Sequence, residues 1–488
     1  METMAPAMLD YEKELESYVG QETAASSLIA SLGKLFFGRS IELVLFRNSL
    51  VDQNVPEVLR LHDYANEVVG KEISVIDTAE LAKEIVGMEE VVPSKLDIGR
   101  LASEWKVEGA AFESKRAFLE NKLGAFMDAS DSGITPRDVV LYGFGRIGRL
   151  AARELIKQAG KGEQLRLRAI VVRKVSDAEL TKRAALLRND SVHGPFPGVI
   201  KEDYENKALI INGQVVKLIA VSNPEDADYT AHGFKDVLVI DNTGVFTDRE
   251  ALGRHKQGKG VEKVLLTAPG KEIPNIVYGV NNEDIDADNE DIFSAASCTT
   301  NAISPILKVI EDNYGVVKGH LETVHAYTND QNLLDNFHKK PRRGRSAAIN
   351  MVITSTGAGK AVTKVIPSFA NKLTANAVRV PTPNGSLAIL SLELMKETSV
   401  EDINNMVRKY ALKGELVNQI NYAVDPELVS NDIVGNTCCS VFDSNATIVS
   451  TDKKNAVLYV WYDNEFGYTK QVIRLAKSIA KVRREIYY

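Results

Sequence analysis

VVLYGFGRIGRLAARELIKQ, at residues 139–158, is the stretch that decides the fold of this chain. Val139–Tyr142 is a short apolar run of the strand-forming type, GFGRIG follows at 143–148, and Arg149–Gln158 has the composition of a helix. In a G-x-G-x-x-G turn between a strand and a helix, the first glycine makes the turn, the second lets the backbone approach a pyrophosphate, and the third lets the helix pack on the strand. The stretch therefore predicts a dinucleotide-binding unit, although the motif alone is a weak match.

The residues that follow alternate between short β-rich runs and helical runs. This pattern predicts the α/β class, with a doubly wound parallel sheet, or Rossmann fold. Beyond Val316 the strand candidates are longer, and we expect them to form an α+β domain with an antiparallel sheet. The candidates are 139–142, 165–172, 237–240 and 264–267 in the first group, and 319–327, 375–380, 387–393 and 456–462 in the second.

Residues 1–134 precede this pattern and are predicted to form a mostly helical N-terminal extension. Apolar residues recur at helical spacing in Tyr11–Leu35 and Val107–Met127, whereas Arg39–Leu50 fits either a helix or a strand. The extension has little proline and no low-complexity tract, so we expect it to be folded. The segment DASDSGITP at 128–136 has the composition of a linker.

A second informative stretch is ASCTTN at 296–301, followed by His325. Cys298 opens an apolar, helix-like segment, and a helix start favours a thiolate through its free N–H groups and partial positive charge. Ser297 and Thr299 are of the residue types that cap such an end, and His325 is a candidate proton-transfer partner 27 positions later. Taken alone, these two residues fit a buried structural cysteine and a core histidine better. Downstream of a dinucleotide turn, they point to a nicotinamide enzyme with a covalent thiol intermediate.

Composition excludes several classes of function. A net charge of −7, from 59 basic and 66 acidic residues, gives the chain no overall attraction for nucleic acid or an anionic membrane. Three cysteines, two of them adjacent, make no disulfide framework, and we predict no metal site. The sequence has no apolar run long enough to span a membrane, and the acidic N-terminus lacks the features of a signal or transit peptide. We therefore expect a cytoplasmic protein.

From Thr135 to the C-terminus, the chain resembles phosphorylating glyceraldehyde-3-phosphate dehydrogenase. The resemblance rests on blocks that occur in the family's order and together are very specific. These are GFGRIGR at 143–149, DSVHGPF at 190–196, NTGVF at 242–246, SCTTN at 297–301, TVHAYTNDQ at 323–331, STGAGKAV at 355–362, VRVPTPN at 378–384 and WYDNEFGYT at 461–469. Residues 1–134 lie outside it.

The resemblance implies a reaction and a domain plan. Glyceraldehyde 3-phosphate would be oxidised with NAD or NADP and inorganic phosphate to 1,3-bisphosphoglycerate, with Cys298 as nucleophile, His325 as base and a thioester between the two half-reactions. The implied domains are 135–297 for the cofactor and 298–465 for catalysis. The last helix, at 469–484, would return to the cofactor domain, so that 466–488 belong with it. The family is usually a homotetramer.

The resemblance also implies binding residues. The stretch KKPRRGR at 339–345 supplies local positive charge, or is simply a solvated basic loop, and Arg345 within it is a weaker, structural candidate. Cofactor-binding residues would be Gly143, Gly145, Arg146, Ile147, Gly148, Thr243, Thr267, Asn464 and Tyr468. The attacking phosphate would be bound by Arg343, Thr356 and Gly357, and the substrate's own phosphate by Thr328, Asp330 and Arg379, with Ser297 and Thr299 beside the nucleophile.

The chain departs from the expected pattern in two places. An NAD site usually has an acidic residue at the end of the second strand, but here Arg173 and Lys174 follow Val172, and the nearest acid is Asp177. We therefore predict that NADP is accepted, alone or alongside NAD, unless Asp177 turns back to the ribose. Ala302 stands where the family often has a second cysteine, which should reduce inactivation by an intramolecular disulfide.

Two other functions fit parts of the sequence. Erythrose-4-phosphate dehydrogenase has a similar fold and cysteine chemistry, and would release free acid without consuming phosphate. The other is a non-catalytic dinucleotide-binding regulatory protein that acts through its N-terminal extension. The presence of Cys298, His325 and the phosphate-binding residues argues against the latter.

Overall fold

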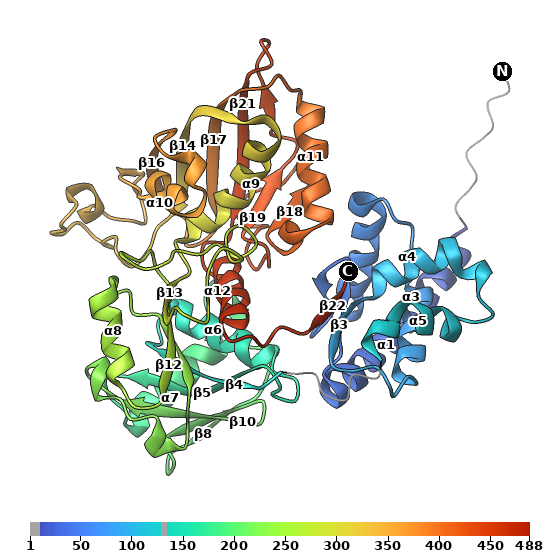
Figure 1. Cartoon of the computed structure of the whole chain (residues 1–488), viewed down its shortest axis with the longest axis horizontal. Coiled ribbons are helices and arrows are strands. Elements are labelled where there is room, and N and C mark those ends of the chain that lie inside the picture. Colours follow the sequence, from blue (N-terminus) through green and yellow to red (C-terminus); the bar gives the residue numbers. More distant parts are fainter. Residues whose placement is uncertain (1–9, 128–133) are drawn as a thin grey trace. The chain divides into compact units, whose positions relative to one another are not determined.

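The computed structural model describes residues 10–127 and 134–488 (Figure 1). They form two compact units, of which unit 1 holds the residues up to Ile134 together with Arg483–Tyr488, and unit 2 is Thr135–Val482. The predicted linker at 128–136 falls at this division, and its first six residues lie outside the described part. No helix in the described ranges is both long and apolar enough to cross a membrane.

The first half of unit 2 is the predicted Rossmann sheet. Six parallel strands follow the order β13-β12-β11-β4-β5-β10, so the chain winds outward in both directions from β4, and the predicted fold class is confirmed. Strands β9 and β8 extend the β10 edge antiparallel. The bounds are β4 Arg137–Tyr142, β5 Leu165–Val172, β8 Ile200–Asp203, β9 Ala208–Ile211, β10 Gln214–Ala220, β11 Val237–Asp241, β12 Val261–Leu266 and β13 Ile292–Ser294.

The helices of this half follow from the spacing of apolar residues. Helix α6 (Arg146–Lys157) buries Leu150, Leu155 and Ile156 on one face. Helices α7 (Asp177–Arg188) and α8 (Arg249–Gln257) start at side-chain caps, Ser176 and Asp248 respectively. Of these three helices, α6 has a glycine, Gly145, as its N-cap, so its N-terminus is free of a capping side chain.

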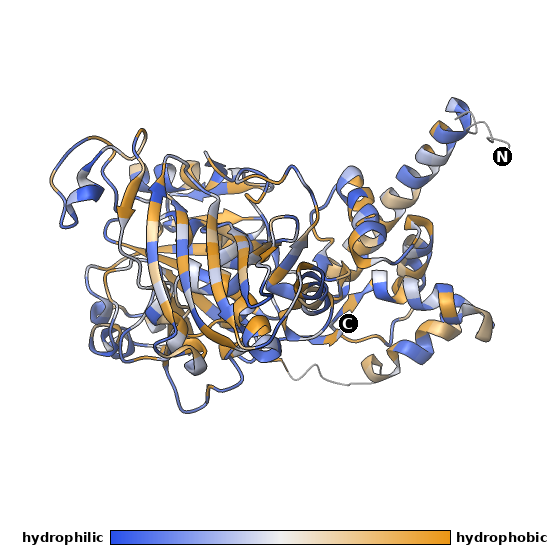
Figure 2. Cartoon of the chain, turned by 90° about the horizontal axis from the view of Figure 1, so that it is seen from above, coloured by the Kyte–Doolittle hydropathy of each residue, from blue (hydrophilic) through white to orange (hydrophobic). Residues whose placement is uncertain are grey.

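The second half of unit 2 is a seven-strand sheet in the order β15-β16-β14-β17-β21-β19-β18, and β20 pairs with β21. It is mixed, because β14–β16 and β18–β19 are parallel, so the prediction of an antiparallel sheet holds only for the other pairs. The long connection from β14 to β16 carries α10 and returns the chain to the starting end, which makes the pair parallel. Figure 2 shows hydrophobic and hydrophilic residues alternating along the strands of this unit. The bounds are β14 Val316–Ala326, β15 Val352–Thr354, β16 Leu373–Val380, β17 Ser386–Leu394, β18 Ile420–Ala423, β19 Ser440–Asp443, β20 Ile448–Val449, β21 Asn455–Tyr462, α9 Cys298–Tyr314, α10 Ala358–Val365 and α11 Val400–Leu412.

The last helix, α12 (Phe466–Ile479), packs beside α6 (Figure 1). Lys470 Nζ lies 2.6 Å from Glu154 Oε1 of α6. The helix ends at Ile479, short of the predicted 484, and residues 483–488 belong to unit 1, so the expectation that all of 466–488 joins the cofactor domain is wrong. Glu485–Tyr487 instead form strand β22, as suits a run of β-branched and aromatic residues.

Unit 1 is mostly helical, as predicted, but it also contains a small sheet in the order β2-β1-β3-β22. The segment Arg39–Leu50, open between helix and strand in the sequence, forms β1 and β2. The predicted helix at 107–127 is broken around Gly109, between α4 and α5. The bounds are α1 Tyr11–Arg39, β1 Glu42–Leu45, β2 Asn48–Ser49, α2 Val55–Tyr64, α3 Val75–Val86, β3 Ser94–Asp97, α4 Ile98–Glu108, α5 Lys115–Leu123 and β22 Glu485–Tyr487.

The C-terminal strand is an integral part of unit 1. β22 pairs parallel with β3, with Tyr487 opposite Leu96. The Tyr487 hydroxyl donates to Glu104 Oε2 at 2.5 Å, and the Arg100 guanidinium lies 4.9 Å from the centre of its ring. Residues 485–487 therefore complete the sheet of a unit whose other described elements lie between residues 11 and 127.

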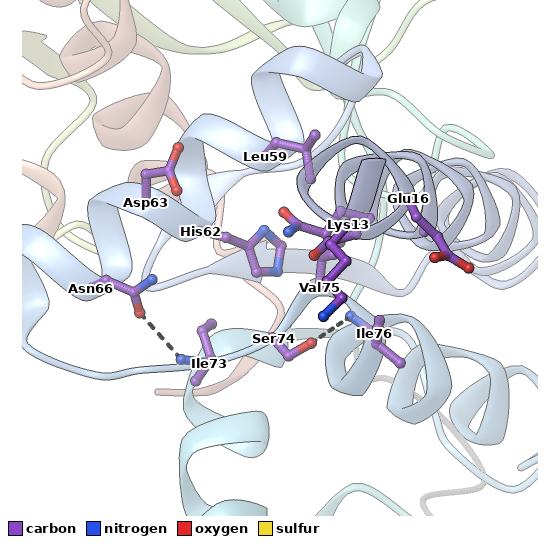
Figure 3. A pocket seen from close by; sticks show the side chains of 13 residues that line it. Lys13, Glu16, Leu59, His62, Asp63, Asn66, Ile73, Ser74, Val75 and Ile76 are labelled. Carbon is purple, nitrogen blue, oxygen red and sulfur yellow. Dashed lines mark hydrogen bonds between the residues drawn. The ribbon is translucent and has the colours of Figure 1, made fainter. Parts of the chain in front are cut away.

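Unit 1 also contains two adjoining cavities, of about 730 and 690 Å³, which share Asn66, Ile73 and Ser74. Figure 3 shows the larger one, where Asn66 Oδ1 accepts from Ile73 N at 3.3 Å and Ser74 Oγ accepts from Ile76 N at 3.1 Å. His62 is fully bonded within it, with Nδ1 2.8 Å from Val58 O and Nε2 2.9 Å from Thr78 Oγ1. Asn66, Ser74 and His62 therefore serve the local backbone and core.

Candidate active site

Cys298 is the first residue of α9. Ser297 caps this helix, because its Oγ accepts from Thr300 N at 3.0 Å and lies 2.7 Å from Thr300 Oγ1. Ala296, just before the cap, has a φ of 55° and so turns the chain sharply into the helix. The capping residues thus place the half-buried Cys298 at the N-terminal end of the helix, as the sequence predicts.

His325 lies near the end of β14, and its Nε2 is 3.6 Å from Cys298 Sγ. The Tyr462 hydroxyl joins the two elements, at 3.0 Å from Thr299 Oγ1 and 2.7 Å from Thr323 Oγ1. The two residues 27 positions apart are therefore within hydrogen-bonding distance. Thr299 faces Tyr462 and is buried, so it supports the helix from inside.

The other ring nitrogen of His325 meets a carbonyl and an arginine. Nδ1 is 2.7 Å from Ala326 O, and Arg379 Nη1 is 3.0 Å from Nδ1 and 2.8 Å from the same oxygen. The contact follows from sheet register, because β14 and β16 pair with His325 directly opposite Arg379. Nδ1–H and the guanidinium can both donate to this carbonyl, which leaves the Nε2 lone pair facing the sulfur.

The electrostatics of the pair differ from the sequence-based expectation of a thiolate. Burial raises the pKa of the Cys298 thiol, an effect that Arg379 opposes. Burial, and then Arg379, lower the pKa of His325 to about 3. A neutral imidazole at this place can accept the thiol proton. Burial therefore opposes the expected resting thiolate, whereas the helix start and Arg379 favour it.

The basic residues near the pair are held in place by acids and hydroxyls. Arg343 forms an ion pair with Asp330 and donates from Nε to Thr354 Oγ1 at 3.0 Å, while His338 Nε2 lies 3.5 Å from Asp330. Asp330 therefore orients Arg343, and its carboxylate is suited to that task and not to direct contact with a phosphate. Sequence reasoning missed Thr354, although it directly precedes the block at 355–362.

Two further predicted residues lie at the start of α10. Gly357 is its N-cap, and Thr356 Oγ1 accepts from Ala358 N at 3.2 Å. Thr328, half-buried, follows the end of β14. Arg345 is paired with Asp335 at 2.8 Å, in agreement with the structural role suggested for it.

The glycine turn has the geometry that a pyrophosphate requires. Gly143 has a φ of 92°, and a Cβ there would lie 2.9 Å from Thr243 Cγ2. A Cβ on Gly148 would lie 2.5 Å from Gly143 O, so helix and strand approach as closely as the motif predicts. A Cβ on Gly145, at the N-terminus of α6, would meet nothing within 4 Å, so that position is open to a ligand.

Arg146 and Ile147 begin α6 directly after this turn. The Arg146 guanidinium is paired with Glu465 at 2.5 Å, and Glu465 is also 3.1 Å from His193 Nε2. Sequence reasoning assigned no role to Glu465 or His193, although both lie in the quoted blocks. Their pairing explains why DSVHGPF and WYDNEFGYT occur together with the glycine turn.

Thr243 and Thr267 are both bonded to Asp241 at the end of β11. Thr243 Oγ1 donates to Asp241 Oδ1 at 2.6 Å, and Thr267 Oγ1 donates to Asp241 O at 3.0 Å. The buried His255 holds the second carboxylate oxygen at 2.9 Å. The two threonines therefore lie at neighbouring strand ends, the edge at which open α/β sheets bind ligands.

Asn464 and Tyr468 bring the start of α12 to the same region. Asn464 Oδ1 accepts from Ser386 Oγ at 2.8 Å, and the buried Tyr468 donates from its hydroxyl to Ala296 O at 2.9 Å. The hydrogen bond of Tyr468 therefore reaches the backbone two residues before Cys298.

The two basic residues at the end of β5 are exposed. Arg173 and Lys174 follow Val172, and Asp177 lies in the first turn of α7. Asp177 Oδ1 is paired with Lys207 Nζ at 2.7 Å. The nearest acid is thus paired with a lysine at the surface.

Over residues 10–127 and 134–488, no group of three or more histidine, cysteine or acidic residues is placed to hold a metal ion. The fold and the site together define an NAD-binding oxidoreductase with separate cofactor and catalytic domains. Comparison with protein families agrees, because the NAD-binding domain of glyceraldehyde 3-phosphate dehydrogenase matches residues 137–249 and its C-terminal domain matches residues 297–464. The chain belongs to the glyceraldehyde-3-phosphate dehydrogenase family.

The relatives differ in how much of the N-terminal extension they share. A glyceraldehyde-3-phosphate dehydrogenase-like protein of Pseudomonas aeruginosa (strain UCBPP-PA14) is 46% identical over 93% of this chain and 98% of its own length. The glyceraldehyde-3-phosphate dehydrogenase of Clostridium pasteurianum is 40% identical over 71% of this chain and 99% of its own length. That of Priestia megaterium (strain DSM 319 / IMG 1521) is 41% identical over 70% of this chain and 97% of its own length. An alignment over 93% of the chain must extend into residues 1–134, so the Pseudomonas protein shares much of the extension.

Proposed function

We propose that the chain oxidises D-glyceraldehyde 3-phosphate to 1,3-bisphosphoglycerate with a nicotinamide dinucleotide and inorganic phosphate. The observation that carries this proposal is the Sγ–Nε2 distance of 3.6 Å between Cys298 and His325 at the start of α9. The family membership and the arginines beside the pair support it. A thiol next to a neutral imidazole can form and break the acyl–sulfur bond that this reaction requires.

In the first half-reaction, Nε2 of His325 accepts the thiol proton as the sulfur of Cys298 attacks the aldehyde carbon. The proton passes to the new alkoxide, giving a thiohemiacetal, and the Cys298 N–H at the helix start stabilises negative charge on that oxygen. His325 then removes the hydroxyl proton, and a nicotinamide held at the cofactor turn would supply the hydride acceptor. A thioester on Cys298 and a protonated His325 remain, so protons and electrons balance.

In the second half-reaction, inorganic phosphate attacks the thioester carbon. We assign this phosphate to Arg343, Thr356 and Gly357, since the first supplies a planar cationic fork and the others lie at the start of α10. The leaving sulfur takes the proton from His325, which restores the resting pair. We assign the substrate's own phosphate to Arg379 and Thr328.

The cofactor turn supports binding of either nicotinamide dinucleotide. Gly143, Gly145 and Gly148 would hold the pyrophosphate, and Asn464 and Tyr468 would border the nicotinamide end. Arg173 and Lys174 would accept a 2′-phosphate, and the pairing of Asp177 with Lys207 at 2.7 Å lessens the repulsion that this acid would exert on it. On this basis we propose that NADP is used alongside NAD.

The substitution Arg173→Ala tests this cofactor proposal. We expect kcat/KM for NADP to fall about tenfold and that for NAD to change little, because only the 2′-phosphate loses a partner. Steady-state assays with each cofactor measure the ratio. A strong preference for NAD in both the wild type and the variant would contradict the proposal.

We also propose a homotetramer in the cytoplasm. The segment between β14 and β15 exposes apolar side chains that a monomer would leave in water. They include Leu333, Leu334, Phe337, Ile349 and Met351, with Phe337 fully exposed. Light scattering after size-exclusion chromatography tests the assembly, and a monomer would contradict it. The three free cysteines suit a reducing compartment.

The experiment that tests the proposed substrate is a steady-state assay with D-glyceraldehyde 3-phosphate, with and without inorganic phosphate. We expect sustained reduction of the cofactor only when phosphate is present. Sustained release of free acid without phosphate would favour the erythrose-4-phosphate type of reaction. No reduction of either cofactor would support a non-catalytic role.

A further inference from the structure

The side-chain amide of Asn464 is nearly buried, yet only one end of it is hydrogen-bonded. Asn464 is 6% exposed, and its Oδ1 accepts from Ser386 Oγ at 2.8 Å. Over residues 10–127 and 134–488, its Nδ2 has no hydrogen-bond partner. A buried amide normally bonds through both its oxygen and its nitrogen, so Nδ2 is a donor suited to an acceptor from outside the chain.

The backbone of Asn464 is fixed by the turn between β21 and α12. The side chain of the preceding residue, Asp463, holds this turn, because its Oδ1 accepts from Glu465 N at 2.9 Å and from Phe466 N at 2.7 Å. These bonds bracket Asn464 on both sides. The remaining freedom of Asn464 is therefore the orientation of its amide, with either Oδ1 or Nδ2 toward Ser386.

Ser386 lies where three parts of the catalytic sheet meet. It is fully buried at the start of β17, opposite Tyr462 at the end of β21. Its Oγ also accepts from Ala326 N, at the end of β14, at 3.1 Å. The contact follows from strand order, because β17 pairs with β14 on one side and with β21 on the other. One hydroxyl thus joins the strand end that carries His325 to the turn that carries Asn464.

The backbone decides the direction of these hydrogen bonds. The N–H of Ala326 can only donate, so it occupies a lone pair of Ser386 Oγ. The single hydroxyl proton of Ser386 is then directed at Asn464 and requires Oδ1 as its acceptor. With the amide reversed, two donors would face the serine oxygen and the buried hydroxyl proton would lose its acceptor. The network therefore keeps Nδ2 as the end of the amide that faces away from Ser386.

We propose that Ser386 is a positioning residue of the cofactor site, which presents Nδ2 of Asn464 as a fixed donor to a carbonyl oxygen on the pyridine ring of the dinucleotide. This inference rests on the proposed function, because it takes a nicotinamide as the group beside Asn464. Its content is a chemical preference, since a fixed donor selects a ring substituent by its acceptor oxygen and not by its NH2 group. Through Ala326 N, the same hydroxyl also holds the peptide next to His325.

Two dinucleotide analogues separate the acceptor from the donor of the ring substituent. Acetylpyridine adenine dinucleotide keeps the carbonyl oxygen and lacks the NH2 group, whereas thionicotinamide adenine dinucleotide keeps the NH2 group and has sulfur, a weaker acceptor, in place of the oxygen. Isothermal titration calorimetry of the full-length enzyme, without aldehyde, measures the dissociation constant of each analogue. We expect the wild type to bind the thionicotinamide analogue about tenfold more weakly than the acetylpyridine analogue, as for the loss of one good hydrogen bond.

Substitutions of buried serines test the positioning role. Ser386→Ala lets the amide of Asn464 present either end, so the acetylpyridine analogue should bind about fivefold more weakly and the ratio of the two dissociation constants should fall from about ten to about two. Ser386→Thr keeps the hydroxyl and should retain the wild-type ratio. Ser440→Ala is the matched control, because Ser440 is also fully buried at a strand start of the same sheet, where its Oγ donates to Ala302 O. This control should leave the ratio unchanged.

The ratio distinguishes positioning from a merely structural role. An equal loss of affinity for both analogues in Ser386→Ala would leave the ratio at its wild-type value and would overturn the proposal. A wild type that binds the two analogues equally would also overturn it, and this result does not depend on the folding of any variant.

The titrations require no aldehyde and no turnover. If the enzyme fails to oxidise glyceraldehyde 3-phosphate but the ratio behaves as expected, the proposed substrate is wrong and the role of Ser386 stands. If the enzyme oxidises this substrate with phosphate but the ratio is the same in the wild type and in Ser386→Ala, the role of Ser386 is wrong and the proposed function stands. A chain that binds neither analogue would overturn both.

Discussion

At the scale of single residues, the sequence locates the reacting pair but not its electronic state. The residue types around Cys298 and the 27-residue offset to His325 are visible in the sequence, and the structure brings the two to 3.6 Å. The shifts in their pKa depend on burial and on Arg379, which reaches the ring through the pairing of β14 with β16. A pKa set by a partner 54 residues away in the chain could not be predicted from local sequence.

Replacement of His325 by glutamine tests its role in catalysis. We expect kcat to fall by about 10²–10⁴-fold, because the variant cannot accept the thiol or hydroxyl proton, while KM changes little. Steady-state kinetics with the aldehyde and the cofactor measure kcat and KM separately. A rise in KM with an unchanged kcat would show that His325 binds substrate and does not move protons.

The low pKa of His325 also predicts a dependence of stability on pH. The folded protein holds this group at a pKa of about 3, below the ordinary value of 6.5, so its contribution is present above pH 6.5 and is lost as pH falls toward 3. Between pH 7 and pH 4, the wild type should lose about 3 kcal/mol more unfolding free energy than His325→Gln. Denaturant unfolding of unit 2 at both pH values measures the difference. Equal losses would contradict a neutral, buried His325.

At the scale of secondary-structure elements, the positions of strands were easier to predict than the strands with which they pair. The predicted runs at 165–172 and 456–462 match β5 and β21 to within a residue, because strand-forming side chains mark them locally. The parallel pair β14–β16 was missed, because its direction depends on an irregular crossover. The end of α12 was also missed, because β22 is stabilised by β3, which lies far away in the sequence.

The N-cap of α9 gives a prediction with a matched control. Ser297→Ala removes the acceptor for Thr300 N, and should cost about 1 kcal/mol of stability and also lower kcat, because the cap positions Cys298. Ser399 caps α11 with an equivalent bond to Asp402 N at 3.1 Å, so Ser399→Ala should cost about as much stability but leave kcat unchanged. Thermal unfolding and steady-state rates measure both effects. Equal kcat in the two variants would refute the positioning role.

At the scale of the whole molecule, the chain is joined twice to its extension, through the segment before Thr135 and through residues 480–484. The sequence predicted that the extension is folded and mostly helical, but could not show that the last residues complete its sheet. Unit 1 is synthesised first yet lacks β22 until the chain is finished. Its sheet is therefore complete only after residues 485–487 have been synthesised, although domains usually fold in the order of synthesis.

Tyr487→Ala tests this dependence on the C-terminus. The variant loses the hydrogen bond to Glu104 and the ring contacts with Arg100 and Phe126, so hydrogen exchange in β3 should become faster, while β4 and β11 remain protected. Tyr11→Ala, at an exposed position of the same unit, is the control and should leave β3 unchanged. Unaltered exchange of β3 in Tyr487→Ala would mean that β22 contributes little to unit 1.

The central claim is that a thioester on Cys298 links oxidation to phosphate transfer. Enzyme mixed with D-glyceraldehyde 3-phosphate and excess oxidised cofactor, in the absence of phosphate, should give one equivalent of reduced cofactor per site and then stop. Peptide mass should locate the acyl group on Cys298, and added phosphate should release it and restart turnover. Continuous reduction without phosphate, or an acyl group absent from Cys298, would contradict the account.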